Sequence, residues 1–571
     1  MDYILDRYVF NNLPFEVSEE TRKLWGQRAL HIVGLADWAC KYQDPWKIFE
    51  NHTSFLFGEL LFFFLAFLTF CHAWRHGTRY VLVWFGILIH ALNVENLCYW
   101  IPDMDNFWQA QGILTFFGAR APLYILIGIY HMFDYTAFVM AKRLHLPWWA
   151  EGPAVGLGAV MLDMPYDIMG IKLVWWTWHD TDPNIFDRMN WVPWNSYYFH
   201  ASFACSFTWL LRGSRYLLVS KEYDWRRLPR EIICVFVAGM GAFWLGTIQF
   251  ALLYHPLHDI YKVHTEYTTI LFLSIYILIV FTADRNNRNP LARAGNKYWF
   301  DELACAIGLE YMFFMVAVLI TDPLNIVSDG LHQPIGPCNE TQKVQTPTGM
   351  VLEKKKYFCT TNFDEKYIDF HCIPGGALPK PTEPGQPLEW YAVCGTDYEN
   401  RAEYITIIWG ICILYGWIWY QVAARSGPTP IDPVKELRKR VVKTIERQDT
   451  TSLTNGKKKI DERYYEDNHG RLSTHPEPFY SDPYESPRFR GNFVTPKPAS
   501  SKKNTPATLK QQQNLKQSAQ KPQPSAQPQP QIQKVVVTKK VEEQEKKVLS
   551  PNSLIADTPA RNLRKRRSRK Y

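Results

Sequence analysis

The sequence lacks the short motifs that mark most nucleotide-binding proteins and common hydrolases. It contains no P-loop, no Gly-rich dinucleotide fingerprint and no Gly-x-Ser-x-Gly elbow in a credible strand–turn–helix context. The repeated His boxes of membrane di-iron desaturases and hydroxylases are absent too, although His255 and His258 are three residues apart and His264 follows. These absences exclude the corresponding enzyme classes, and we predict neither a metal nor a cofactor.

Three further absences concern the chain as a whole. The segment from Met1 to Asn12 has no basic start followed by an apolar core, so no cleavable signal peptide is predicted. There is no polar sequence comparable in extent to the apolar stretches that could cover them, which excludes a large soluble protein with buried helices. No inverted repeat of the transporter type is evident either.

What the sequence does contain is a series of nine apolar stretches between residues 53 and 423. Each is close to the ~20 residues that cross ~30 Å of hydrocarbon, and together they cover 53–74, 80–101, 110–135, 150–176, 193–212, 231–254, 264–283, 300–322 and 402–423. Backbone groups in lipid must be hydrogen-bonded within their own segment, so these stretches are expected to be helices. The predicted fold class is all-α, a polytopic transmembrane helix bundle.

The charges of the connecting loops alternate in sign. Lys and Arg gather after the first, third, fifth and seventh spans, whereas the loops after spans two and four carry Asp. Basic loops stay in the cytoplasm, so we expect the N-terminus to be extracytoplasmic and the C-terminus cytoplasmic, in the plasma membrane or an endomembrane.

The loop between spans eight and nine gives an independent indication of the same orientation. It holds a glycosylation sequon at Asn339 and four cysteines, and we expect a glycan and two disulfides on the oxidising side. The spacing leaves three pairings open for Cys338, Cys359, Cys372 and Cys394.

The chain therefore divides into six predicted parts: an extracytoplasmic segment 1–52, an eight-helix bundle 53–323, a Cys-rich loop 324–401, a ninth helix 402–423, a basic juxtamembrane helix 424–448 and a disordered tail 449–571. The basic helix is expected to bind anionic lipid, or else to be a solvated helix end. The Pro/Gln/Lys-rich tail cannot bury enough apolar surface to fold, but it offers a surface to cytoplasmic partners. Because the formal charge of +8 comes largely from this tail, it gives no reason to expect nucleic acid binding.

Ionisable residues within the spans mark function, because charges are costly in a bilayer. Asp163 and Asp167 share one helical face, and Arg120 is the natural partner for either. We predict catalytic roles for these three residues in a polar cavity that opens outward, and ligand-binding roles for Glu59, His90, Glu95, Tyr124, His131, Asp134 and His200. The alternative is that these groups join helix to helix.

Two segments resemble bacterial carotenoid hydratase-like membrane proteins. One is Gly118-Ala119-Arg120-Ala121-Pro122-Leu123-Tyr124-Ile125, and the other is Trp175-Trp176-Thr177-Trp178 followed by Trp191-Val192-Pro193-Trp194-Asn195. The resemblance covers spans two to five and implies a bundle that handles an isoprenoid. The cysteine loop and the tail depart from that family. The whole chain resembles uncharacterised multipass membrane proteins of animals, from which no activity carries over.

Three functions remain open from the sequence. The first is a membrane protein that binds or modifies a lipid or isoprenoid, in which a buried carboxyl protonates an alkene or positions water. The second is a transporter or channel in which the same acids relay protons or cations. The third is a receptor-like or scaffold protein whose loop and tail bind partners. The sequence does not decide whether the protein is an enzyme.

Overall fold

The computed structural model describes residues 6–14, 16–178, 181–219, 223–331, 333–379 and 391–430. It also describes one short strand pair beyond them, formed by β13 (Tyr465–Glu466) and β14 (Leu472–Ser473). Most of the predicted basic helix 424–448 and nearly all of the predicted tail 449–571 lie outside the described residues.

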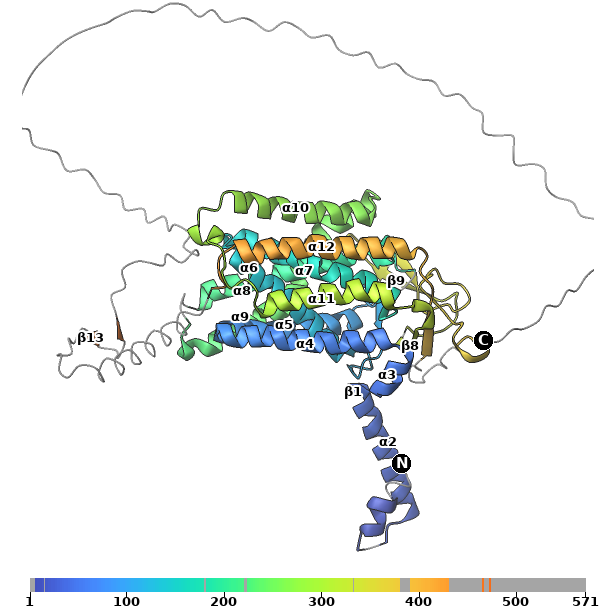
Figure 1. Ribbon diagram of the computed structural model, residues 1–571. Helices are drawn as coiled ribbons and strands as arrows, with labels where there is room; N and C mark the ends of the chain where they lie inside the picture. Colours follow the sequence, from blue (N-terminus) through green and yellow to red (C-terminus); the bar gives the residue numbers. More distant parts are fainter. Residues whose placement is uncertain are drawn as a thin grey trace, which may run out of the picture. The chain divides into compact units, whose positions relative to one another are not determined.

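Long helices form a bundle in which they run side by side (Figure 1): α4 (Thr53–His76), α5 (Thr78–Trp100), α7 (Trp148–Lys172), α8 (Trp194–Leu218), α9 (Leu228–His255), α10 (Thr265–Arg285), α11 (Glu302–Ile320) and α12 (Arg401–Arg425). A further helical stretch joins them, in which the π-helical turns η2 (Ile125–Ile129) and η3 (His131–Tyr135) lead into α6 (Thr136–Arg143). Helices α2 (Glu19–Ala39) and α3 (Pro45–Asn51) precede the bundle, and a third π-helical turn, η5 (Pro256–Ile260), follows α9. Short 3-10 turns complete the helical content: η1 (Phe10–Asn12), η4 (Trp225–Arg227), η6 (Pro290–Arg293), η7 (Pro323–Asn325) and η8 (Pro374–Gly376).

Seven of the described helices are long and apolar enough to cross a membrane: α4, α5, α7, the segment Trp225–Ile260 that contains α9, α10, α11 and α12. Their outer faces carry large apolar side chains that are more than half exposed, including Phe67, Trp244 and Leu278. Soluble monomers rarely expose so much apolar surface, whereas lipid accepts it. The chain is therefore an integral membrane protein. The two other predicted spans are represented by α8 and by the helical stretch 125–143, which fall outside these seven.

The predicted third span begins too early. Residues 110–122 are not helical, because they contain β3 (Leu114–Phe116), β4 (Ala121–Pro122) and, between them, a turn in which Phe117 and Ala119 have φ of 56° and 65°. The carboxylate of Glu59 in α4 accepts the backbone N–H of Ile113 at 3.1 Å from each oxygen. Non-helical backbone is tolerated among membrane helices where protein groups satisfy it, and Glu59 does so here.

Helix α7 lies at the centre of the bundle and packs against α6, α8, α10, α11 and α12. Glycine permits this close packing, since a Cβ added at Gly156 would lie 2.4 Å from the carbonyl oxygen of Ala201 in α8. At Gly170 an added Cβ would lie 2.1 Å from the ring of Trp176. The central position of α7 explains why both of its aspartates, Asp163 and Asp167, are buried.

One end of the bundle, called the basic end below, is held by buried ion pairs. Glu231 at the start of α9 accepts from Nε of Arg79 at 2.7 Å and from Nε of Arg215 at 2.9 Å. Glu151 pairs in the same way with Lys142 and Arg212, and Arg143 pairs with Asp301. The basic residues that follow the first, third and fifth predicted spans thus bind the starts of neighbouring helices.

The opposite end, called the loop end below, carries the Cys-rich loop. The four cysteines form two disulfides, as their even number predicted, and the structure decides the pairing as Cys338–Cys359 and Cys372–Cys394. The loop contains an antiparallel hairpin of β9 (Thr341–Gln345) and β10 (Val351–Lys355), and a sheet in the order β11 (Ile368–Asp369), β12 (Tyr391–Gly395), β8 (Val327–Leu331).

Short strands between the helices complete the loop end. They form a three-stranded sheet of β1 (Cys40–Tyr42), β3 and β4, an antiparallel ribbon of β2 (Phe107–Gln109) with β5 (Trp176–Trp178), and a pair of β6 (Arg188–Met189) with β7 (Val192–Pro193). In the β2–β5 ribbon Phe107 is opposite Trp178 and Gln109 is opposite Trp176. This ribbon brings aromatic side chains to the loop end of the bundle.

Candidate functional site

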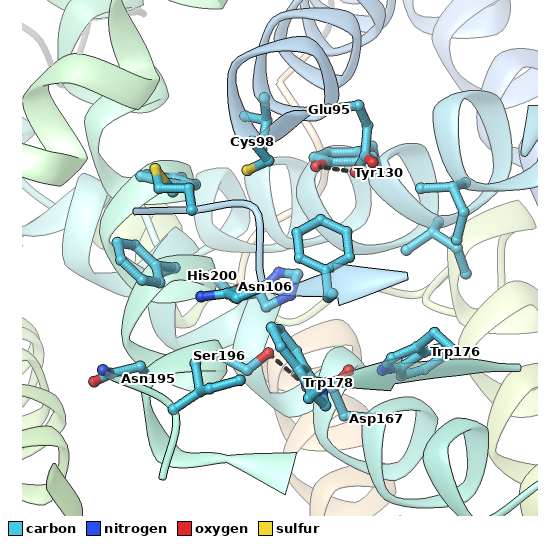
Figure 2. Close-up of a pocket in the computed structure, with 18 of the residues that line it drawn as sticks. Glu95, Cys98, Asn106, Tyr130, Asp167, Trp176, Trp178, Asn195, Ser196 and His200 are labelled. Atoms are coloured by element: carbon cyan, nitrogen blue, oxygen red, sulfur yellow. Dashed lines mark hydrogen bonds between the residues drawn. The ribbon is translucent and has the colours of Figure 1, made fainter. Parts of the chain in front are cut away.

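A cavity of about 160 Å³ lies within the bundle, towards the loop end. Its walls come from α5, the helical stretch 125–143, α7 and α8, and from the β2–β5 ribbon. Figure 2 shows Glu95 and Tyr130 on one side of the space and Asp167 and Ser196 on the opposite side. The volume exceeds that of one water molecule many times over, so the cavity has room for a ligand.

Most of the wall is aromatic or aliphatic, with rings from Phe107, Phe133, Tyr166, Trp176, Trp178 and Phe199. The ionisable groups that line it are four carboxyls and two imidazoles, from Glu95, Asp103, Asp134, Asp167, His90 and His200. No lysine or arginine of the described chain lines the cavity. The site is therefore acidic, with apolar walls, which is unsuited to a phosphate and suited to a neutral or cationic polar group.

The α5 side of the cavity pairs polar groups across helices. The hydroxyl of Tyr130 donates to Glu95 at 3.0 Å, and Nε2 of His90 lies 4.0 Å from Asp134. Tyr130 stands between the π-helical turns η2 and η3, and Asp134 lies in η3. π-helical turns are rare and occur frequently at functional sites, because the wider turn re-aims side chains.

The α7 side brings two carboxyls and an imidazole together. The hydroxyl of Ser196 donates to Asp167 at 2.7 Å, and Nε2 of His200 lies 3.4 Å from Asp163. Asp163 and Asp167 are four residues apart on α7, which places them on the same helical face, and His200 comes from α8. Asp163 lies behind the cavity wall, whereas Asp167 and His200 line the space.

Of the seven residues predicted to bind a ligand, four line this cavity: His90, Glu95, Asp134 and His200. The other three lie elsewhere in the core. Glu59 binds the backbone of Ile113, Nε2 of His131 is 2.9 Å from the carbonyl oxygen of Trp84, and the hydroxyls of Tyr124 and Tyr166 are 3.4 Å apart. These three residues connect structural elements and do not line the cavity.

The predicted pairing of Arg120 with Asp163 or Asp167 is wrong. Arg120 donates to Asp105 at 2.6 Å, and its guanidinium lies 3.6 Å from the centre of the Trp108 ring. Because residues 110–122 are not helical, Arg120 lies outside the stretch that lines the cavity, and the preceding loop supplies its partner. It does not line the cavity.

Comparison with known protein families gives a match over most of the chain. A family model described as a domain of unknown function, DUF7802, matches residues 1–424. The chain belongs to the DUF7802 family. The match reaches into the last turn of α12, so the DUF7802 domain contains the bundle, the Cys-rich loop and the cavity. No curated protein and no solved structure matches the chain.

Several residues of the DUF7802 cavity escaped the sequence analysis. Tyr130 and Ser196 are neutral, so their presence within apolar segments does not mark them as functional in the sequence, although each donates to a carboxyl. Trp176 and Trp178 were noted only as part of a tryptophan-rich segment and not as residues of the site. Their strand pairing with β2, which directs them to the cavity, has no local signal in the sequence.

The β9–β10 hairpin forms hydrogen bonds to the loops next to the DUF7802 cavity, at the loop end of the bundle. Nζ of Lys354 lies 3.3 Å from Asp182 and donates to the carbonyl oxygen of Asp105 at 3.1 Å. Thr348, in the hairpin turn, donates to Asp259 at 3.0 Å. Lys354 and Asp182 are almost completely buried, with exposed fractions of 4% and 2%. The Cys-rich loop therefore covers the loops that form the outer wall of the cavity.

Asp103 lies in that outer wall and accepts from Nδ2 of Asn184 at 3.0 Å. The pKa of Asp103 is raised from 3.8 to about 6, mainly by burial and also by the nearby charge of Asp182, while Lys354 and Asn184 act in the opposite direction. Asp103 thus changes charge near pH 6.

This pKa predicts a pH dependence of stability. Between pH 3.8 and about 6 the folded protein holds a proton on Asp103 that the unfolded chain releases, so stability falls as pH rises through this window. The interval corresponds to at most about 3 kcal/mol. We expect Asp103→Asn to flatten the change in unfolding midpoint between pH 4 and about 6.5. Asp364→Asn, at an exposed position of the Cys-rich loop, is the control, and identical profiles for wild type and Asp103→Asn would contradict the prediction.

Proposed function

We propose that this protein binds a lipid-like or isoprenoid ligand within its membrane bundle, with the polar group of the ligand at the acids and histidines of the cavity. The observation that carries this proposal is the combination of aromatic walls with Glu95, Asp134 and Asp167 in a site that no lysine or arginine of the described chain lines. A hydroxyl or an ammonium can donate to these carboxyls, whereas a phosphate would face like charge and lose its hydration without compensation.

The surroundings of the cavity support a lipophilic ligand. The cavity lies among helices with apolar outer faces, and its rings offer flat surfaces to an unsaturated or cyclic chain. The tryptophans Trp176 and Trp178 belong to the segment that resembles the carotenoid hydratase-like proteins. That resemblance supports an isoprenoid as one member of the ligand class, and chemical modification of that ligand by Asp167 belongs to the same proposal.

Mass spectrometry of purified protein tests the proposal. The full chain is extracted in mild detergent, washed, and its retained lipids are compared with those of Glu95→Gln and of Glu340→Gln. Glu340 is an exposed acid in the Cys-rich loop and serves as the control. We expect one neutral or cationic lipid class to be retained by wild type and control, and reduced at least about tenfold in Glu95→Gln, a loss of about 1.4 kcal/mol. A retained phospholipid mixture that is the same in all three proteins would overturn the proposal.

A relay of protons or cations is the second candidate. Four buried carboxyls, from Asp134, Asp163, Asp167 and Glu310, lie within the bundle, and neither oxygen of Asp163 or Glu310 accepts a hydrogen bond from the described chain. Such groups occur in ion pathways of membrane proteins. Flux of protons or sodium into proteoliposomes, abolished by Asp163→Asn, would favour this candidate. Absence of both a retained lipid and flux would favour a scaffold whose loop and tail bind partners.

We propose the finer topology together with this function. Nine membrane crossings, with α8 and the helical stretch 125–143 as the two more polar ones, place the basic end in the cytoplasm and the loop end outside. The basic ion-paired end and the disulfide-bonded loop lie at opposite ends of the bundle, which supports this orientation. The same orientation exposes the sequon at Asn339 to glycosylation, and it places anionic lipid and cytoplasmic partners next to the C-terminal region.

A further inference from the structure

The two aspartates of α7 and His200 of α8 form a compact set of ligand atoms. One carboxylate oxygen from each of Asp163 and Asp167 and one ring nitrogen of His200 all lie within 4.8 Å of one another. The separation of Nε2 of His200 from Oδ1 of Asp163 is 3.4 Å. Two donor atoms bonded to one tetrahedral ion at about 2.0–2.2 Å are about 3.3–3.6 Å apart. The separation of His200 from Asp163 fits this spacing directly, and a separation near the 4.8 Å limit would close by a small rotation of the side chains.

The two aspartates are buried, His200 is partly exposed, and the charge of the aspartates has no compensating lysine or arginine in the described chain. Asp163 is completely buried and neither of its oxygens accepts a hydrogen bond, while Asp167 is 4% exposed and accepts one from Ser196. No described lysine or arginine forms an ion pair with either aspartate. Neighbouring carboxylates in a low-dielectric core are strongly destabilising unless a cation or a proton neutralises them.

We propose that Asp163, Asp167 and His200 bind a divalent transition-metal ion such as Zn²⁺ or Mn²⁺. Two carboxylates and a neutral imidazole are typical ligands of these ions, and the imidazole makes the site less suited to Mg²⁺ and Ca²⁺. The hydroxyl of Ser196 orients the carboxylate of Asp167, as outer-shell donors do in metal sites. The charge of the ion also removes the cost of burying both aspartates together.

Three protein ligands leave a coordination position for water or for a ligand group. Because Asp167 and His200 line the cavity and Asp163 lies behind them, that position is on the cavity side. The inference goes beyond the proposed lipid binding and does not depend on it, since an ion can be held in a cavity that is free of lipid. A proton shared between the two aspartates is the competing solution for the same buried charges.

Metal analysis of the full chain tests the site. Protein made without a histidine tag is treated with EDTA, loaded with ZnCl₂ or with MnCl₂, and desalted. Elemental mass spectrometry then measures the metal content of wild type, Asp163→Asn, His200→Gln and His90→Gln. His90 is the matched control, because it also lines the cavity but does not belong to the three-residue set. We expect about one ion per chain in wild type and in His90→Gln, and a metal content at least about tenfold lower in the other two variants, since loss of a ligand weakens metal binding.

A second measurement keeps the test independent of variant folding. The thermal unfolding of EDTA-treated wild type should shift upward when ZnCl₂ is added, because the ion binds the folded state. Wild type that neither retains an ion nor shifts its midpoint would overturn the metal site and leave a shared proton as the explanation. Retention by His200→Gln equal to wild type would overturn it as well. Loss of the lipid in the retention experiment, with the ion still bound, would reject the proposed function and not this site.

Discussion

Glu231→Ala is expected to lower the free energy of unfolding by about 3–5 kcal/mol. Glu231 is completely buried and joins three helices, because its two oxygens accept from Arg79 of α5 and Arg215 of α8. Its removal leaves two partly buried guanidinium groups close together at the basic end without the carboxylate that compensates them. The loss of stability comes mainly from leaving these two guanidinium charges without a neighbouring carboxylate, and less from the loss of the attraction itself.

Unfolding in detergent, followed by circular dichroism, measures this effect. Asp284→Ala is the control, because its pair with Arg293 is largely exposed and should contribute less than about 1 kcal/mol. The triple variant that replaces Glu231, Arg79 and Arg215 with leucine should recover much of the lost stability, since apolar side chains carry no desolvation cost. A Glu231→Ala protein as stable as the Asp284→Ala protein would contradict the conclusion that buried ion pairs stabilise the basic end.

Replacing Cys372 and Cys394 together with alanine is expected to destabilise the Cys-rich loop by about 3 kcal/mol. The bond joins residues 22 positions apart and holds β12 within the sheet that it forms with β8 and β11. Without it the unfolded loop gains conformational freedom, while the helices keep their own contacts. Hydrogen exchange should therefore increase in the loop and stay unchanged in α7 and α8.

The second disulfide provides a matched comparison. Cys338 and Cys359 are 21 residues apart, so the loss of chain entropy predicts nearly the same cost when both are replaced. If replacing one cysteine pair lowers the stability by less than about 0.5 kcal/mol and replacing the other lowers it by about 3 kcal/mol, the entropy of loop closure is not the cause. Differences between the native contacts around the two disulfides would then account for the effect. Increased exchange in α7 or α8 after either replacement would show that the loop stabilises the bundle itself.

The helical elements were predictable because their signal is local. The predicted span 53–74 and helix α4 (Thr53–His76) have nearly the same limits, since an apolar run of this length satisfies its own backbone. The run at 110–135 was also predicted to be one helical span, yet its first half is not helical. There the carboxylate of Glu59 satisfies the backbone of Ile113 from another helix. Glu59, 54 positions earlier in the sequence, thus accepts the backbone hydrogen bond that Ile113 would otherwise donate within a helix.

The candidate site was likewise predictable only where its geometry depends on residues close together in the sequence. The spacing of Asp163 and Asp167 placed them on one face of α7, because helical geometry depends on adjacent residues alone. Arg120 was assigned to the same site by assuming a helix, and the turn before it instead provides Asp105 as its partner. His200 was recognised as polar and buried, but its approach to Asp163 depends on how α7 and α8 pack.

Sequence alone thus determined that this chain is a helical membrane protein with two disulfides, because hydrophobic length and cysteine content act through local chemistry. Only the tertiary structure decided which cysteines pair, which acids share a cavity and which cation each carboxylate meets. Those choices arise from helix packing and from strands such as β2 and β5, which join residues about 70 positions apart. The energies of buried charges depend on distances of a few ångströms, and such distances follow from packing rather than from residue order.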